Sequence, residues 1–239
     1  MDFTPGLPEN ADEMIFILTE SIVACQKCPR LVAWREQVAR ERRKAYREEV
    51  YWGKPVPGFG DIHGRVLAVG LAPGAHGANR TGRMFTGDGS GDFLYETLFR
   101  AGFASQPGSY AIEDSLALSD LFISAVCRCA PPGNKPKPEE IANCLPYLQT
   151  EIDLMKNLQV IVALGKIAFD GILRVVRQKV GEDFHSKDFT FAHGAVYRLR
   201  DGWPWLVAAY HPSRQNTQTG RLTKEMFDEV WKKVRGLLD

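Results

Sequence analysis

The residues best suited to chemistry in this 239-residue chain lie in three polar segments, each of which follows an apolar run. The first is rich in glycine and carries an acid, Asp88, the second contains Cys127 and Cys129, and the third begins with His211 in a His-Pro-Ser sequence. An imidazole donates or accepts a proton near neutral pH, and a carboxylate positions water or stabilises positive charge. His211 and Asp88 are therefore the candidate catalytic residues.

Both residues also have an ordinary structural interpretation. A lone histidine is more often a satisfied structural residue, but His211 ends a predicted strand at an edge where ligands bind. Asp88 precedes a predicted helix, and aspartate commonly caps helices and forms turns. The sequence is compatible with either role for Asp88, capping the helix or positioning water.

Alternating strands and helices predict the elements that hold these segments in place. Strands are expected at residues 65–71, 121–129, 158–165 and 205–211, with a hairpin or edge strand within 189–200. Helices are expected at residues 11–24, 31–50, 91–103, 137–157, 166–179 and 222–238. This order predicts a three-layer α/β/α fold around a mostly parallel four-stranded sheet, in a single domain spanning residues 1–239.

Ligands of such open sheets bind at the carboxyl ends of the strands. Three loops are expected there: the glycine-rich loop that starts at Gly70, the segment RCAPPGNKP at 128–136, and the segment HPSRQNTQTGR at 211–221. Their convergence at one edge is stronger evidence for a site than any loop alone.

Four of the five cysteines have spacings that suit a metal centre. Cys25 and Cys28 form a C-x2-C pair, and Cys129 and Cys144 are separated by fourteen residues. Four thiolates bind Zn²⁺ or a [4Fe–4S] cluster, and the spacing does not choose between them. Cys127 would share a strand face with Cys129, so the pattern does not exclude it as a ligand.

Composition narrows the class of protein. A net charge of +1 means that any contact with nucleic acid must come from a local patch, such as the basic run at residues 27–47, which otherwise forms a solvated helix face. No apolar run reaches the roughly 18 residues of a membrane-spanning helix, and the acidic N-terminal stretch is not a secretory signal. An odd number of cysteines argues against a disulfide framework, and we expect a cytoplasmic location.

Three long motifs resemble the type B, family 5 uracil-DNA glycosylases. They are GLAPGAHGANRTGRMFTGDGSG, AVCRCAPPGNKPKPEE and HPSRQNTQTGRLT, and with the cysteines they extend the resemblance over roughly residues 20–225. The resemblance implies the uracil-DNA glycosylase fold, with N-terminal helices tied to it by a structural [4Fe–4S] cluster. The implied ligands are Cys25, Cys28, Cys129 and Cys144, which leaves Cys127 outside the cluster.

The resemblance also implies an activity. A monofunctional glycosylase of this kind takes the damaged nucleotide out of the stack and hydrolyses its N-glycosidic bond, leaving an abasic site. The implied substrate is DNA that contains uracil or another deaminated base such as hypoxanthine, and we expect a monomer.

Individual roles follow from the motifs. His211 is expected to donate a hydrogen bond to O2 of the leaving uracil, and Phe85 to stack on the base. Gly70 and Ala72 let the backbone approach the base and its sugar. His76 and Asn79 are expected to contact the base or the water, and Arg80 a phosphate. The residues expected to contact DNA are Ser213, Arg214, Gln215 and Arg221, and Gln215 would fill the space left in the DNA by the extruded nucleotide.

Two departures from related families shape the expected mechanism. Leu71 and Ala72 stand where other families carry an acid, so leaving-group stabilisation by His211 is expected to dominate, with Asp88 as a helper. Ala125 stands where some relatives carry a base-reading Asn, which predicts recognition by backbone groups and a pocket open to hypoxanthine.

Two other functions compete with this one. The first is a non-catalytic DNA-binding module stabilised by an Fe–S cluster or zinc. The second is a phosphate-binding α/β enzyme, which is weakened because the glycine-rich loop fits neither the dinucleotide-binding nor the P-loop motif.

Overall fold

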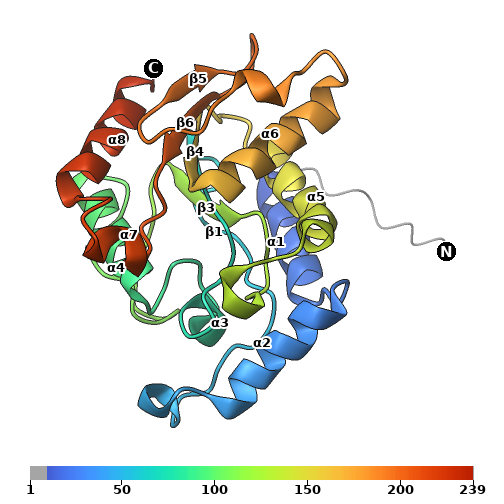
Figure 1. Cartoon of the computed structure of the whole chain (residues 1–239), viewed down its shortest axis with the longest axis vertical. Helices are drawn as coiled ribbons and strands as arrows, with labels where there is room; N and C mark the ends of the chain where they lie inside the picture. The colour runs from blue at the N-terminus through green and yellow to red at the C-terminus, as the bar shows by residue number, and fades with distance from the viewer. Residues whose placement is uncertain (1–9, 239) are drawn as a thin grey trace, which may run out of the picture.

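A six-stranded sheet forms the middle layer of the structure, a computed structural model that describes residues 10–238 (Figure 1). The strands, in the order β1-β3-β2-β4-β6-β5, are β1 Phe59–Gly60, β3 Leu121–Ala125, β2 Val66–Gly70, β4 Val160–Leu164, β6 Trp205–Ala209 and β5 Val196–Arg198. The four central strands pair in parallel, and the two edge strands are antiparallel. The mostly parallel sheet and the edge strand within residues 189–200 (β5) are confirmed, but the second edge strand, β1, was not predicted.

Helices cover both faces of this sheet, which gives the predicted three layers (Figure 1). The helices are α1 Ala11–Val23, α2 Pro29–Glu41, α3 Ala78–Thr81, α4 Gly89–Arg100, α5 Pro138–Leu154, α6 Lys166–Val180, α7 Arg214–Gln218 and α8 Lys224–Gly236. Short 3₁₀ turns are η1 Lys44–Tyr46, η2 Pro132–Asn134 and η3 Ser186–Asp188. Helices α4 and α8 lie on one face, and α5 and α6 lie on the other.

Each central strand feeds two cores, because successive side chains point to opposite faces. In β2, Val66 and Ala68 pack with α4 and α8, whereas Leu67 and Val69 pack with α5 and α6. All four are fully buried, which explains the continuous apolar pattern of the strand.

Several predicted boundaries are wrong for local reasons. The helix expected over 31–50 ends at Glu41, because Arg42 has a left-handed backbone (φ 53°) that does not continue a helix. The strand expected over 121–129 ends at Ala125, so the two cysteines that follow do not share a strand face. Part of the polar loop after His211 is the short helix α7, which Ser213 caps.

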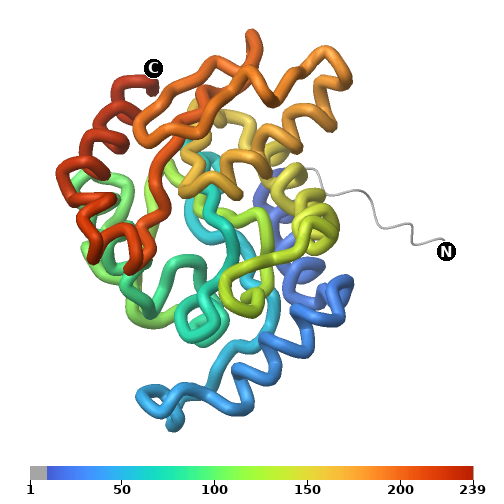
Figure 2. Tube along the Cα trace, viewed as in Figure 1, coloured from blue at the N-terminus to red at the C-terminus, as the bar shows by residue number. Residues whose placement is uncertain are grey.

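The N-terminal helices pack on α5 and on the glycine-rich segment, and α1 starts near the amino end of β2, where Asp12 Oδ1 is 2.9 Å from His63 Nε2. Helix α1 lies against α5, and α2 reaches α3 (Figure 2). At this contact Asn79 Nδ2 donates to the Arg35 carbonyl at 3.3 Å. No helix among residues 10–238 is both long enough and apolar enough to cross a bilayer. Residues 1–9 of the acidic stretch tested for a secretory signal lie outside the described residues.

Candidate active site

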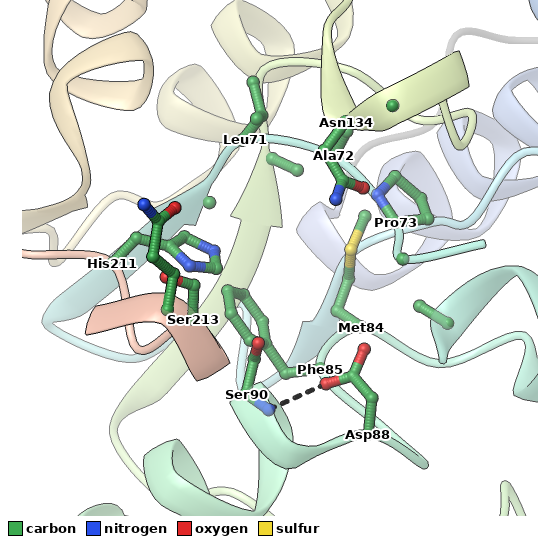
Figure 3. A pocket seen from close by; sticks show the side chains of 16 residues that line it. Leu71, Ala72, Pro73, Met84, Phe85, Asp88, Ser90, Asn134, His211 and Ser213 are labelled. Carbon is green, nitrogen blue, oxygen red and sulfur yellow. Dashed lines mark hydrogen bonds between the residues drawn. The ribbon is translucent and has the colours of Figure 1, made fainter. Parts of the chain in front are cut away.

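A cavity of about 400 Å³ opens at the carboxyl ends of β2, β3 and β6 (Figure 3). It is lined by Gly70, Leu71, Ala72, Pro73, Gly74, Ala78, Met84, Phe85, Asp88, Ser90, Ala125, Gly133, Asn134, His211, Ser213 and Gln215. All three predicted loops contribute to this lining, so their convergence is confirmed. The volume is within the range usual for small-molecule pockets.

His211 enters the pocket just beyond the end of β6 (Figure 3). Its backbone carbonyl accepts hydrogen bonds from Ser213 N at 2.7 Å and from Asn216 Nδ2 at 2.8 Å. Burial lowers the pKa of His211 to about 4, so the imidazole is neutral at pH 7. Within residues 10–238, no group forms a hydrogen bond to its ring nitrogens. Its ring N–H is therefore free to donate to a ligand in the pocket.

Phe85 stacks on His211 inside the pocket. The two ring centroids are 5.8 Å apart and the rings are inclined by 30°. A Cβ atom at Gly70 would lie 2.8 Å from the Phe85 ring, closer than van der Waals contact allows. Only glycine at position 70 lets Phe85 approach the end of the strand this closely. The ring of Phe85 in turn shapes the pocket.

The turn that presents Phe85 is held by a buried arginine that the sequence did not point to. Phe85 has a left-handed backbone (φ 53°), which is unfavourable for a bulky residue. Arg83 is 3% exposed and donates to Thr86 Oγ1 at 3.0 Å and to Asp114 at 2.7 Å. These bonds close the turn on both sides of Phe85 and stabilise its strained conformation.

Asp88 caps a helix, and its second carboxylate oxygen reaches the pocket wall. Its Oδ1 atom accepts from the N–H groups of Ser90 and Gly91, at 2.9 and 3.1 Å, and so caps α4. Its Oδ2 atom lies over the glycine-rich loop, 2.7 Å from a Cβ position at Gly74 and 2.0 Å from one at Gly77. The cap thus fixes the carboxylate at the pocket wall (Figure 3).

Asn134 is a pocket residue that the sequence-based assignment omits. It ends η2 in the loop after β3, with a left-handed backbone (φ 57°) that asparagine tolerates better than most residues. Its carboxamide extends toward the space between the glycine-rich loop and Phe85 (Figure 3). Side-chain recognition is therefore available despite Ala125. The sequence feature that could have revealed Asn134 is its Gly-Asn pair, which lies in a loop predicted to be at the ligand-binding edge.

Three predicted binding residues do not line the pocket. Asn79 is fully buried, and its Nδ2 donates to backbone carbonyls of Arg35 and Ala75. His76 Nδ1 is 3.1 Å from the Tyr51 hydroxyl. Arg80 pairs with Glu49, donates to the Gly87 carbonyl at 2.8 Å and lies over the Tyr46 ring. This arrangement does not support the contacts predicted for them with base, water or phosphate.

The segment after His211 divides into two groups. Ser213 and Gln215 line the pocket, as expected for residues near an extruded nucleotide. Arg214 and Arg221 are exposed outside it, and the Arg221 guanidinium lies 4.8 Å from the Tyr210 ring centroid.

The cysteines gather where α1, α2 and α5 meet the loop after β3. Cys127 and Cys144 pack with Leu18 and Ile22 of α1. Arg35 Nη1 donates to Cys129 Sγ at 3.0 Å, and a hydrogen bond from Cys127 lowers the pKa of Cys144 to about 7. Within residues 10–238, no group of three or more His, Cys, Asp or Glu side chains is arranged to hold a metal ion.

The basic run is only partly a solvated face. Arg30 pairs with Glu140 at 2.6 Å, and Arg35 is 1% exposed. Arg40, Arg43 and Arg47 are exposed.

Comparisons with known proteins identify the family to which the chain belongs. The family model described as the uracil DNA glycosylase superfamily matches residues 57–235. The chain therefore belongs to the uracil DNA glycosylase superfamily.

Its position within the superfamily follows from individual relatives. A type-5 uracil-DNA glycosylase of Thermus thermophilus is 50% identical over 91% of this chain and 95% of its own length. A type-5 uracil-DNA glycosylase of Pyrobaculum aerophilum is 40% identical over 89% and 88%, and a type-4 uracil-DNA glycosylase of the same organism is 32% identical over 87% and 89%. The resemblance to family 5 is confirmed.

Proposed function

We propose that the chain is a monofunctional uracil-DNA glycosylase, which hydrolyses the N-glycosidic bond of uracil in DNA and leaves an abasic site. The observation that carries the proposal is the neutral imidazole of His211 beside the face of Phe85, in a pocket where residues 70–74 contribute no acid. An extruded base stacks on an aromatic ring, and a donor aimed at its carbonyl stabilises the charge that develops as the bond breaks.

The proposed division of labour places leaving-group stabilisation first. As the bond lengthens, negative charge grows on the uracil and positive charge grows on the sugar. The His211 N–H stabilises the base oxygen O2, and the Asp88 carboxylate at the opposite wall favours the cationic sugar. Asn134 is placed to bind either the base edge or the attacking water.

Hydrolysis rather than lyase chemistry is proposed because of what lines the pocket. A bifunctional glycosylase attacks the sugar with an amine, most often from lysine. No lysine lines the cavity within residues 10–238. Water is therefore the nucleophile in this proposal, and the DNA strand is left intact.

A 5′-labelled duplex with one uracil tests the reaction. We expect strand cleavage only after alkali treatment, with His211→Ala as the inactive control. Cleavage without alkali would show a lyase. Binding without any alkali-labile product would overturn the proposal and favour the non-catalytic DNA-binding module.

We extend the substrate class to hypoxanthine because Ala125, at the end of β3, adds no polar side chain to the pocket. The test is a lesion panel of uracil, hypoxanthine and xanthine, with adenine as the undamaged control. Excision of uracil alone would contradict the extension.

We also propose that Cys25, Cys28, Cys129 and Cys144 hold a structural [4Fe–4S] cluster. The donor chemistry fits, because metal-bound thiolates accept hydrogen bonds. Cys129 accepts from Arg35 at 3.0 Å, Cys28 from Asn143 Nδ2 at 3.6 Å, and Cys144 from Cys127. When bound, the cluster ties α1 and α2 to α5 and takes no part in hydrolysis. Iron and sulfide analysis of the purified protein tests it, and zinc in their place would contradict it.

A further inference from the structure

His193, which lies outside the pocket, contacts the strand end that carries His211. It is partly exposed and occupies the turn just before β5. Its Nδ1 atom accepts a hydrogen bond from the backbone N–H of Tyr210 at 3.0 Å, one residue before His211. Its Nε2 atom lies 3.3 Å from the carbonyl of Met226 in α8.

These two contacts fix the tautomer of His193. A nitrogen that accepts from a backbone N–H carries no proton, so the proton is on Nε2 and is donated to Met226. The ring is therefore neutral and is held at both ends. It also stacks on the Tyr210 ring, with centroids 4.9 Å apart and an angle of 26°.

The bond to Tyr210 extends the sheet beyond its backbone ladder. Near this edge of β6, Gly194 N donates to the Ala208 carbonyl at 2.7 Å, and Ala208 N donates to the Ala195 carbonyl at 2.9 Å. The next N–H on this side belongs to Tyr210, and its partner is the His193 side chain instead of a backbone carbonyl.

We infer that His193 is a positioning residue for His211. Its Nδ1 atom fixes the backbone immediately before His211, while Ser213 N and Asn216 Nδ2 fix the carbonyl of His211 itself. The backbone from which the His211 imidazole projects is thus fixed by hydrogen bonds on both sides. This inference rests on the proposed function, in which His211 acts on the leaving base.

Geometry of this kind affects rate more than binding. A donor displaced by about 1 Å loses up to about 100-fold in rate, because its hydrogen bond matters most in the transition state. Loss of the Nδ1 bond should therefore lower the maximal rate of base excision and leave the half-saturating enzyme concentration nearly unchanged.

Two substitutions separate the Nδ1 contact from the rest of the ring. In His193→Asn, the side-chain oxygen takes the place of Nδ1 and still accepts from Tyr210. In His193→Gln, the amide reaches the place of Nε2 and retains only the contact with Met226. His185→Gln, on an exposed residue of the same region, is the matched control.

Single-turnover excision at saturating enzyme gives the first readout. We expect His193→Asn and His185→Gln to stay within about threefold of the native rate, and His193→Gln to fall about 10-fold to 100-fold. Equal losses in the two His193 variants, or a loss seen only in the half-saturating concentration, would overturn the inference.

Imidazole NMR of ¹⁵N-histidine-labelled protein gives a second readout that needs no activity. The His211 signals should move in His193→Gln and stay in place in His193→Asn, and unchanged signals in both would overturn the inference. If the native chain excises no uracil, the proposed function fails, while this spectrum still tests the positioning role.

Discussion

The carboxylate of Asp88 occupies the space that a side chain on Gly77 would need. Its Oδ2 atom lies 2.0 Å from a Cβ position on Gly77, while its Oδ1 atom caps α4. A carboxylate thus lies beside the glycine-rich loop, although Leu71 and Ala72 carry none.

Gly77→Ala should displace this carboxylate and destabilise the fold by about 1–3 kcal/mol, as overpacking usually does. Thermal or urea unfolding measures the loss. The double variant Gly77→Ala/Asp88→Ser should recover part of it, because serine still caps α4 and lacks the intruding oxygen. Gly236→Ala, where nothing lies within 4 Å, is the control. Strictly additive losses in the double variant would contradict the steric explanation.

His211→Ala should reduce the single-turnover rate of uracil excision far more than Asp88→Asn. Removing one donor to developing charge typically costs about 100-fold to 1,000-fold in rate. Asparagine at position 88 retains the cap and removes only the charge, so its effect reports the electrostatic role alone. Equal and complete losses in both variants would contradict a mechanism led by the leaving group.

The low pKa of His211 predicts an unusual pH profile. Because burial places this pKa at about 4, below the usual histidine value near 6.5, the imidazole stays neutral across the range where histidines normally titrate. The excision rate, measured in single turnover, should be level between about pH 8 and about pH 5.5 and change only toward pH 4. A half-maximal point near pH 6.5 would show that His211 titrates normally.

The same shift affects stability with a defined sign. The unfolded chain takes up a proton on this histidine at its usual pKa, while the folded chain resists it until pH about 4. The contribution of His211 is therefore present in full above about pH 6.5 and falls as the pH drops toward 4. Urea unfolding of the native chain and His211→Gln across this range isolates the difference.

Arg35→Met should weaken retention of the proposed cluster. This arginine is 1% exposed and donates to Cys129 Sγ, and partners of metal ligands commonly contribute about 10-fold to 100-fold in metal affinity. The expected result is faster loss of iron and of visible absorbance in the presence of a chelator. Arg40→Met, on the exposed face of the same helix, is the control. Equal rates of loss in the two variants would contradict the role.

The sequence by itself determined the parallel sheet, the edge at which ligands bind and the three loops that meet there. These features depend on local regularities: the burial pattern of each strand, the alternation of strand and helix, and the rule that places loops at carboxyl ends. His211 and Phe85 follow from the same regularities, because each lies in one of those loops.

Only the tertiary structure decided which loop side chains enter the pocket. Asn134 enters it, whereas Asn79 and Arg80 turn to partners in α2 and the segment before β1. A loop, or a helix of a single turn such as α3, has no sequence period from which a side-chain direction can be read, so that direction depends on what packs against it. The approach of the Asp88 carboxylate to Gly77 and the bond from Tyr210 to His193 were hidden for the same reason, since each depends on how the chain folds.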